Sequence, residues 1–270
     1  MTSGTLTRRI VPPIRFGASN SLRLIERNLL VYRRMWMIIF SGFFEPVFYL
    51  FSIGVGIGQL VGDVSTGGGA PVSYAEFVAP GLLAASAMNG AVFESTMNIF
   101  FKLKYGRIYD AMLATPLAPG DVAVGEIGWS LLRGAIYAVG FLIVMLLGGL
   151  MPSWWGLMAL PAALVIGFGF AGVGMATTTF MRSWQDFDMV TLVTLPMFLF
   201  SGTFYPLSVY PGWMQGVARF SPLYHGVDLI RGLTLGIFDW SMLGHLGFLM
   251  GMGLIGLMIA GRRVEKLLLS

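Results

Sequence analysis

The chain has 270 residues, of which 56% are hydrophobic and only 11% are charged. Soluble domains carry about 25% charged residues, so this composition excludes a water-soluble domain and indicates a protein embedded in lipid. The formal net charge of +4 calls for no nucleic-acid partner, because basic residues gather beside membrane spans. With no cysteine and two histidines, disulfides, thiolate metal sites and a histidine metal cage are excluded.

Residues 1–34 are expected to be a cytoplasmic segment that is kept in the mature protein. They contain seven arginines and no apolar core, unlike a cleavable signal peptide. From residue 17 onward, Leu22, Ile25 and Leu29 recur at helical spacing with charged residues on other faces. This pattern predicts an amphipathic helix at 17–34 in the membrane interface. The helix is either a simple juxtamembrane element or a docking site for a partner.

Residues 35–270 are expected to form one all-α membrane domain with six transmembrane helices. A span needs about 20 predominantly apolar residues, and Gly-rich or polar stretches separate the hydrophobic runs. The GxGxG run at 54–58 lies in an apolar helix, which indicates close helix packing and not a nucleotide loop. The six spans are predicted at about 35–60, 77–101, 122–150, 155–181, 188–204 and 241–261.

The distribution of basic residues predicts that both termini lie in the cytoplasm. With that orientation, fourteen of the 17 lysines and arginines fall in inner segments and only Arg219 and Arg231 fall outside. An excess of lysine and arginine in the inner segments sets the orientation of a membrane protein.

Four charges lie inside predicted spans, where each costs roughly 2.5–3.5 kcal/mol on insertion scales and needs a partner or a wet path. We expect Glu94 of the second span, or Glu126, to pair with Arg133 of the third. Such a pair either fixes helix packing or lies on the substrate path. Glu45 of the first span has no evident basic partner at its depth, so it is the better candidate for lining a polar cavity.

The polar stretch 102–121 is predicted to be a structured cytoplasmic loop on which another protein acts. The chain has no GxxxxGK[ST] sequence, so it cannot hydrolyse ATP with a P-loop. No nucleophile–base–acid set, HExxH sequence or paired-carboxylate site is evident either, which disfavours an enzyme.

The outer segment 205–232 is rich in aromatic residues and is broken by three prolines. We expect a re-entrant hairpin of short helices that dips into the outer leaflet before the last span. His225 and Asp228 are expected to form a local structural bond or part of an exit gate. The other polar candidates of this hairpin are Tyr205, Tyr224 and Arg231.

These pieces resemble the ABC-2 type permeases, most closely the nodulation-type lipo-oligosaccharide and daunorubicin-type drug exporters. The resemblance rests on FVAPGLLAASAM at 77–88, FEST at 93–96, YDAMLATPLAPGDVAVGE at 109–126, LFSGTFYP at 199–206 and SPLYHGVDLIRGL at 221–233. It covers almost the whole chain.

The resemblance implies an export permease of the inner membrane that works as a homodimer, or with a similar permease, on two cytoplasmic ABC ATPase subunits. ATP and Mg would be used by the ATPase, with no cofactor bound by this chain. The family's coupling helix corresponds to about 102–116, its connecting helix to 17–34 and its outer hairpin to 205–232. The coupling residues expected here are Lys104, Tyr105, Arg107, Tyr109, Asp110 and Leu113.

The substrate does not transfer from the family, although an amphipathic or lipid-linked molecule would suit walls of Phe, Met and Leu. Two alternatives remain open. A membrane enzyme would need Glu45, His225 and Asp228 to converge in one cavity, and a channel or scaffold would need no ATPase.

Overall fold

The computed structural model describes residues 18–33, 44, 46–65, 71–106, 108–113, 115 and 117–269. In that part the protein is almost entirely helical, which confirms the all-α fold class. The exception is a short antiparallel pair, β1 (Asp63–Val64) with β2 (Val72–Ser73). The predictions for Glu45, Arg107 and residues 1–17 concern positions outside the described residues.

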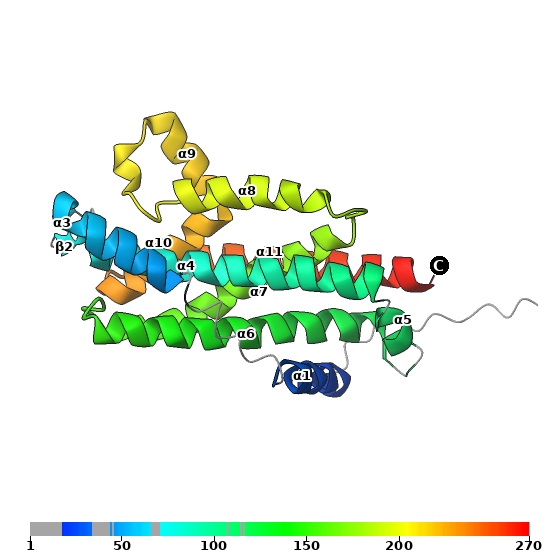
Figure 1. Cartoon of the computed structure of the whole chain (residues 1–270). Coiled ribbons are helices and arrows are strands. Elements are labelled where there is room, and N and C mark those ends of the chain that lie inside the picture. The colour runs from blue at the N-terminus through cyan, green and yellow to red at the C-terminus, as the bar shows by residue number, and fades with distance from the viewer. Residues whose placement is uncertain are drawn as a thin grey trace, which may run out of the picture.

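Among the described residues, four helices are long and apolar enough to cross a membrane, and they run side by side (Figure 1). They match the predicted second, third, fourth and sixth spans within a few residues. The first of them, Tyr74–Tyr105, is α4 (Tyr74–Phe93) continued by the π-helical segments η2 (Glu94–Asn98) and η3 (Phe101–Tyr105). The others are α6 (Pro119–Leu147), the 3-10 helix η4 (Trp154–Met158) with α7 (Ala159–Thr178), and α11 (Ser241–Leu269).

The predicted first and fifth spans remain predictions. The first is described only in part, as the apolar stretch Pro46–Val61 with η1 (Leu50–Ile57) and α3 (Gly58–Val61). The fifth corresponds to α8 (Asp186–Phe200), which has 15 residues. At 1.5 Å per residue it is about 22 Å long, shorter than a hydrocarbon core of about 30 Å.

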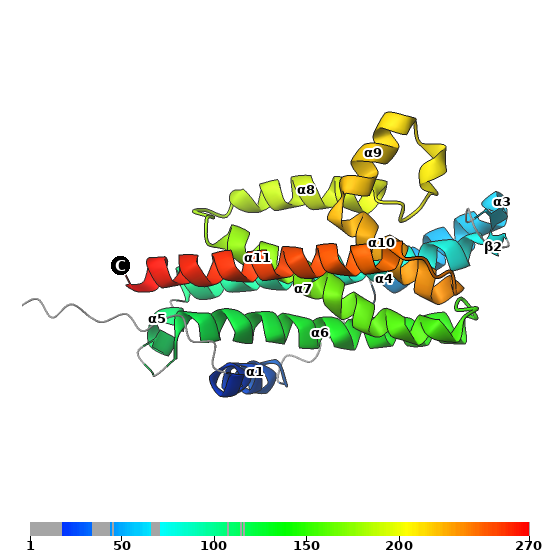
Figure 2. The same cartoon turned by 180° about the vertical axis from the view of Figure 1, so that it is seen from behind.

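Glycines bring α7 and α11 into backbone contact. A Cβ added to Gly256 would lie 2.3 Å from the carbonyl carbon of Gly172, and one added to Gly172 would lie 2.5 Å from the carbonyl oxygen of Gly253. Small residues let membrane helices approach this closely. The glycines of the fourth span therefore position α11 against the centre of the bundle (Figure 2).

The amphipathic helix predicted at 17–34 is present as α1 (Ala18–Arg33), and it packs against α6. Its Leu24 side chain fills a notch in α6, because a Cβ on Gly125 would lie 2.7 Å from Leu24 Cδ1. Ile25 meets Gly128 in the same way, at 2.8 Å. One face of α1 is thus docked on the bundle, while Leu30 stays exposed on the other.

The coupling loop predicted at 102–121, for which the resemblance implies a helix at about 102–116, contains a short helix, and the flanking helices extend into it from both sides. The preceding helix continues to Tyr105, the short helix α5 spans Ile108–Leu113, and α6 already begins at Pro119. The Asp121 side chain accepts a hydrogen bond from the Ala118 backbone N–H at 3.1 Å and caps α6. In both views α5 and the C-terminus lie at the same end of the bundle (Figures 1 and 2).

Residues 205–232 form short helices that begin beside prolines, as predicted. They are η5 (Leu207–Val209), α9 (Gly212–Phe220) and α10 (Pro222–Leu235). α10 packs against α4, α7 and α11, whereas α9 stands away from the four long helices (Figure 1). The depth of this hairpin in a bilayer stays a prediction.

Candidate coupling end and apolar groove

A surface groove of about 510 Å³ separates α1 from α5 at the end of the bundle that holds the C-terminus. Its walls come from two segments far apart in the sequence, which α6 holds together. A partner that enters this groove would contact both segments at once. The lining residues are Arg23, Leu24, Arg27, Ile108, Ala111, Met112, Thr115 and Leu117.

Buried polar side chains attach the coupling segment to α6. Lys102 Nζ donates to Glu126 Oε2 at 2.7 Å, and both side chains are at least 90% buried. Tyr109 of α5 is fully buried, and its pKa is raised well above its ordinary value by burial and then by the charge of Glu126. A displacement of α5 would therefore act directly on the N-terminal half of α6.

The expected coupling residues divide into an outer and an inner set. Lys104 and Tyr105 are exposed at the end of η3, where a partner can reach them. Tyr109 is an internal anchor and not a contact for a partner. Asp110 and Leu113 belong to α5, and only their backbone is described here. The sequence analysis did not predict the ion pair of Lys102 with Glu126. A basic and an acidic residue 24 positions apart, near the facing ends of two consecutive antiparallel helices, could have indicated it.

The predicted pair of Glu94 and Arg133 is present inside the bundle. Arg133 Nη1 donates to Glu94 Oε2, and Arg133 Nε donates to the Tyr137 hydroxyl at 2.9 Å. The indole N–H of Trp129 donates to Glu94 Oε1 at 3.0 Å, and Asn98 Nδ2 donates to the same oxygen. The alternative pairing of Arg133 with Glu126 is wrong, because Glu126 bonds Lys102.

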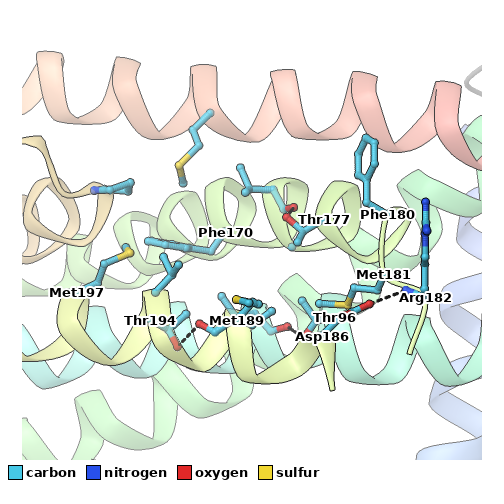
Figure 3. A pocket seen from close by; sticks show the side chains of 17 residues that line it. Thr96, Phe170, Thr177, Phe180, Met181, Arg182, Asp186, Met189, Thr194 and Met197 are labelled. Carbon is cyan, nitrogen blue, oxygen red and sulfur yellow. Dashed lines mark hydrogen bonds between the residues drawn. The ribbon is translucent and has the colours of Figure 1, made fainter. Parts of the chain in front are cut away.

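An apolar groove of about 690 Å³ runs between α8 and the helices α4, α7 and α11 (Figure 3). It forms because α8 stands off the bundle and buries none of its residues. Figure 3 shows methionine and phenylalanine side chains along its length. Residues that line it include Thr96, Phe170, Val173, Met189, Val193 and Met197.

One end of the groove is polar. Asp186 Oδ2 accepts hydrogen bonds from the backbone N–H groups of Arg182 at 2.7 Å and Ser183 at 3.1 Å. These two hydrogen bonds lower the pKa of Asp186, and the bond from Arg182 contributes more than the bond from Ser183. The Asp186 carboxylate and the Arg182 side chain therefore offer charge of both signs at the mouth of an apolar passage (Figure 3). This arrangement suits an amphipathic molecule.

The outer residues do not pair as expected. Asp228 Oδ2 contacts His245 Nε2 of α11 at 3.0 Å, and His245 Nδ1 lies 2.7 Å from His225 Nδ1. The expected bond between His225 and Asp228 is thus replaced by one through His245, a residue that sequence reasoning did not include. Tyr224 borders both rings, and Tyr205 is exposed.

Arg231 of α10 holds the hairpin to the bundle. Its guanidinium donates to the carbonyls of Phe77 at 3.1 Å and Gly202 at 2.8 Å, and it lies 3.9 Å from the centre of the Phe77 ring. These bonds join α10, α4 and the end of α8. Arg231 is therefore a structural cross-link.

Within the described part of the chain, no group of three histidine, cysteine or acidic side chains could hold a metal ion. Two features of the geometry call for a function: a groove at one end shared by α1 and α5, and an apolar passage along α8. The first suits a protein partner, and the second suits a molecule that moves along the membrane normal.

Comparison with known proteins finds the ABC-2 type transporter family, whose model matches residues 21–235. Nodulation protein J of Rhizobium leguminosarum bv. viciae is 36% identical over 236 residues, covering 86% of this chain and 89% of the relative. Nodulation protein J of Rhizobium meliloti (strain 1021) is 33% identical, covering 86% of each chain. The inner membrane transport permease YadH of Escherichia coli (strain K12) is 27% identical, covering 74% of this chain and 77% of the relative.

Proposed function

Because the chain belongs to the ABC-2 type transporter family, we propose that it is the permease subunit of an ATP-driven exporter. Its two copies, each with a cytoplasmic ABC ATPase subunit, would move an amphipathic or lipid-linked molecule out of the cytoplasm or the inner leaflet. Both termini would lie in the cytoplasm, which follows from the distribution of basic residues. ATP and Mg would be bound by the ATPase and not by this chain.

The observation that carries this proposal is the groove between α1 and α5. The α5 wall of this groove packs on η3, which carries the exposed Lys104 and Tyr105. Beneath that surface Lys102 bonds Glu126, and the buried Tyr109 lies close to the same carboxylate. A partner that pushes on α5 would move α6, and through Leu24 in its glycine notch it would move α1 as well. ATP-driven closure of the partner would in this way shift the helices as a rigid body.

The apolar groove along α8 supports the proposed substrate class. Methionine, phenylalanine and valine side chains offer an adaptable wall to an acyl or aromatic portion. The polar mouth at Arg182 and Asp186 lies at the end of the bundle near α5, where a head group would enter from the cytoplasmic side. The resemblance of the sequence to nodulation-type lipo-oligosaccharide exporters makes a lipid-linked cargo the first one to test.

Charge reversal at the coupling end tests the proposal. Lys104→Glu and Asp110→Lys should each lower ATP-dependent export at unchanged amounts of folded permease, since both residues belong to the segment expected to contact the ATPase. The matched control is Arg219→Glu, an exposed charge reversal at the opposite end on α9. Export that is normal in both coupling variants would overturn the assignment.

The alternatives of an enzyme or an ATP-independent channel have less support. Asp228 and His225 meet through His245, but the three side chains form a line with no nucleophile among them. Flux through purified, reconstituted permease without any ATPase would favour the channel.

A further inference from the structure

Both histidines of the chain lie in one hydrogen-bonded line that joins α10 to α11. The line runs from the Asp228 carboxylate to His245 Nε2 at 3.0 Å, and from His245 Nδ1 to His225 Nδ1 at 2.7 Å. We call these three residues the Asp–His–His triad. His225 also stacks on Phe248 of α11, with ring centres 4.2 Å apart. The triad is therefore the polar part of the contact between the outer hairpin and the last span.

The geometry of the triad fixes where its protons are. An ionised carboxylate only accepts hydrogen bonds, so His245 must carry a proton on Nε2 to bond Asp228. If His245 is neutral, its Nδ1 is then an acceptor, and His225 must donate from its own Nδ1. In this arrangement each imidazole takes part in a hydrogen bond of the triad, and the triad carries one negative charge, on Asp228.

Adding protons has two different consequences. The first proton can enter Nε2 of His225, the remaining unprotonated ring nitrogen outside the contact, and it leaves both hydrogen bonds of the triad in place. A second proton would have to enter Nδ1 of His245. Two N–H groups would then face each other across 2.7 Å between two positively charged rings, and the contact could not persist.

Charged and titratable groups surround the triad on the elements that pack against α10 and α11. On α10 the neighbouring charged or titratable groups are Tyr224, Asp228 and Arg231, whose guanidinium is bound to backbone carbonyls. α9 contributes Arg219, and the turn before α11 contributes Asp239. α4 has Tyr74 and Glu76 in its first turn, the latter bonded to Ser73. α8, which packs on α10, carries Asp186 and Asp188 in its first turn. α6, which packs on α11, carries Asp121, Glu126, Arg133 and Tyr137, of which Glu126 is bonded to Lys102 and Arg133 to Glu94. α7 and η4, which also pack on α10, contain no ionisable residue.

We propose that the Asp–His–His triad is a proton-operated switch that holds α10 against α11 when at most one proton is added and releases it when both imidazoles are charged. The protons come from bulk water, and no other reactant is needed. The switch would place the outer hairpin under the control of pH at that end of the bundle, and it does not depend on the transport activity proposed above.

The contact between α10 and α11 should weaken as pH falls, because it forms with both histidines uncharged. Burial and the neighbouring His245 lower the pKa of His225 below its ordinary value. A histidine with a lowered pKa in the folded state binds fewer protons there than in the unfolded chain. The closed contact is therefore favoured above a pH of about 6.5 and disfavoured as pH falls below that value, most of all at the second proton, which removes the hydrogen bond between the two rings.

Nitrogen-15 labelling of histidine tests the proposal in the full chain in lipid nanodiscs, because the two histidines are the only ones present. Near pH 8, His245 should carry its proton on Nε2 and His225 on Nδ1, with a hydrogen bond between the rings. Protons should then be taken up in two steps about 1 pH unit or more apart, as expected for coupled groups. Independent titration of both rings near the ordinary value would overturn the proposal.

A distance measurement tests the release itself. The chain has no cysteine, so spin labels attach only at cysteines that are introduced. Phe220→Cys and Leu243→Cys place them at two exposed positions, one on each side of the contact. The distance between them should increase across the second titration step. A distance that stays constant through full protonation of both rings would refute the switch.

Three variants separate the switch from simple packing. His225→Gln can still donate to His245 but cannot become charged, so the distance should lose the change seen at the second step. Asp228→Asn removes the charge that favours imidazolium, so both steps should shift to lower pH. Tyr224→Phe keeps the ring that borders both histidines and should behave as the unaltered protein. Equal pH profiles for all three variants would contradict the proposal.

Discussion

Removing one member of the buried pair Glu94–Arg133 should harm the protein more than removing both. Both side chains are at least 90% buried, and Glu94 also accepts hydrogen bonds from Trp129 and Asn98. Breaking such a pair on one side costs about 3–5 kcal/mol, whereas replacing both members by apolar residues is often neutral or stabilising. Glu94→Met and Arg133→Met should each show that loss, and the double variant should regain most of it.

The assay is the thermal midpoint of the purified permease in detergent, together with its yield as a single species by size-exclusion chromatography. A loss of 3–5 kcal/mol corresponds to roughly 6–20 °C for a chain of this size. Leu192→Met, a change at an exposed position on α8, controls for expression. Equal midpoints and yields for both single variants and the double variant would refute the reasoning.

Three further predictions concern neighbouring positions with matched controls. Lys102→Met should destabilise the protein by about 3–5 kcal/mol by stranding Glu126, whereas Lys104→Met at an exposed site should change stability by no more than about 0.5 kcal/mol; chemical unfolding of both variants compares them. Gly256→Ala would place a Cβ 2.3 Å from the Gly172 backbone and should cost about 3 kcal/mol, while Gly251→Ala on the same helix meets nothing within 4 Å and should be tolerated; their thermal midpoints decide this. Val193→Trp should narrow the groove along α8 and lower export roughly tenfold, about 1.4 kcal/mol of lost binding, and a vesicle export assay should find Leu192→Trp, which does not line the groove, unchanged.

Much of the helical framework could be predicted because hydrophobic runs separated by polar turns determine where spans begin and end. The Glu94–Arg133 pair could also be predicted, since both charges lie at similar depth in consecutive antiparallel helices. The stretch 102–121 was harder, because basic residues suggest a loop although the helix continues another turn to Tyr105. Lys102 was consequently assigned to a cytoplasmic loop, and its bond with Glu126 was missed.

Features that depend on the register of distant helices could not be read from the sequence. His245 lies 20 residues from His225 on another helix, and only the packing of α10 on α11 brings their rings together. The apolar groove along α8 exists because α8 stands away from the bundle, and the apolar sequence of α8 does not reveal that position. The notch that receives Leu24 requires Gly125 and Gly128 to face α1, and this orientation is set by tertiary packing.

The most direct test of the central claim is ATP-dependent export in reconstituted vesicles. The permease would be purified with the ATPase subunit that accompanies it from its own cells, and movement of a fluorescent lipid-linked oligosaccharide would be followed with and without ATP. Our account predicts export that requires ATP and the ATPase and that falls in Lys104→Glu and Asp110→Lys but not in Arg219→Glu. Equal export without ATP, or equal export by the coupling variants, would contradict it.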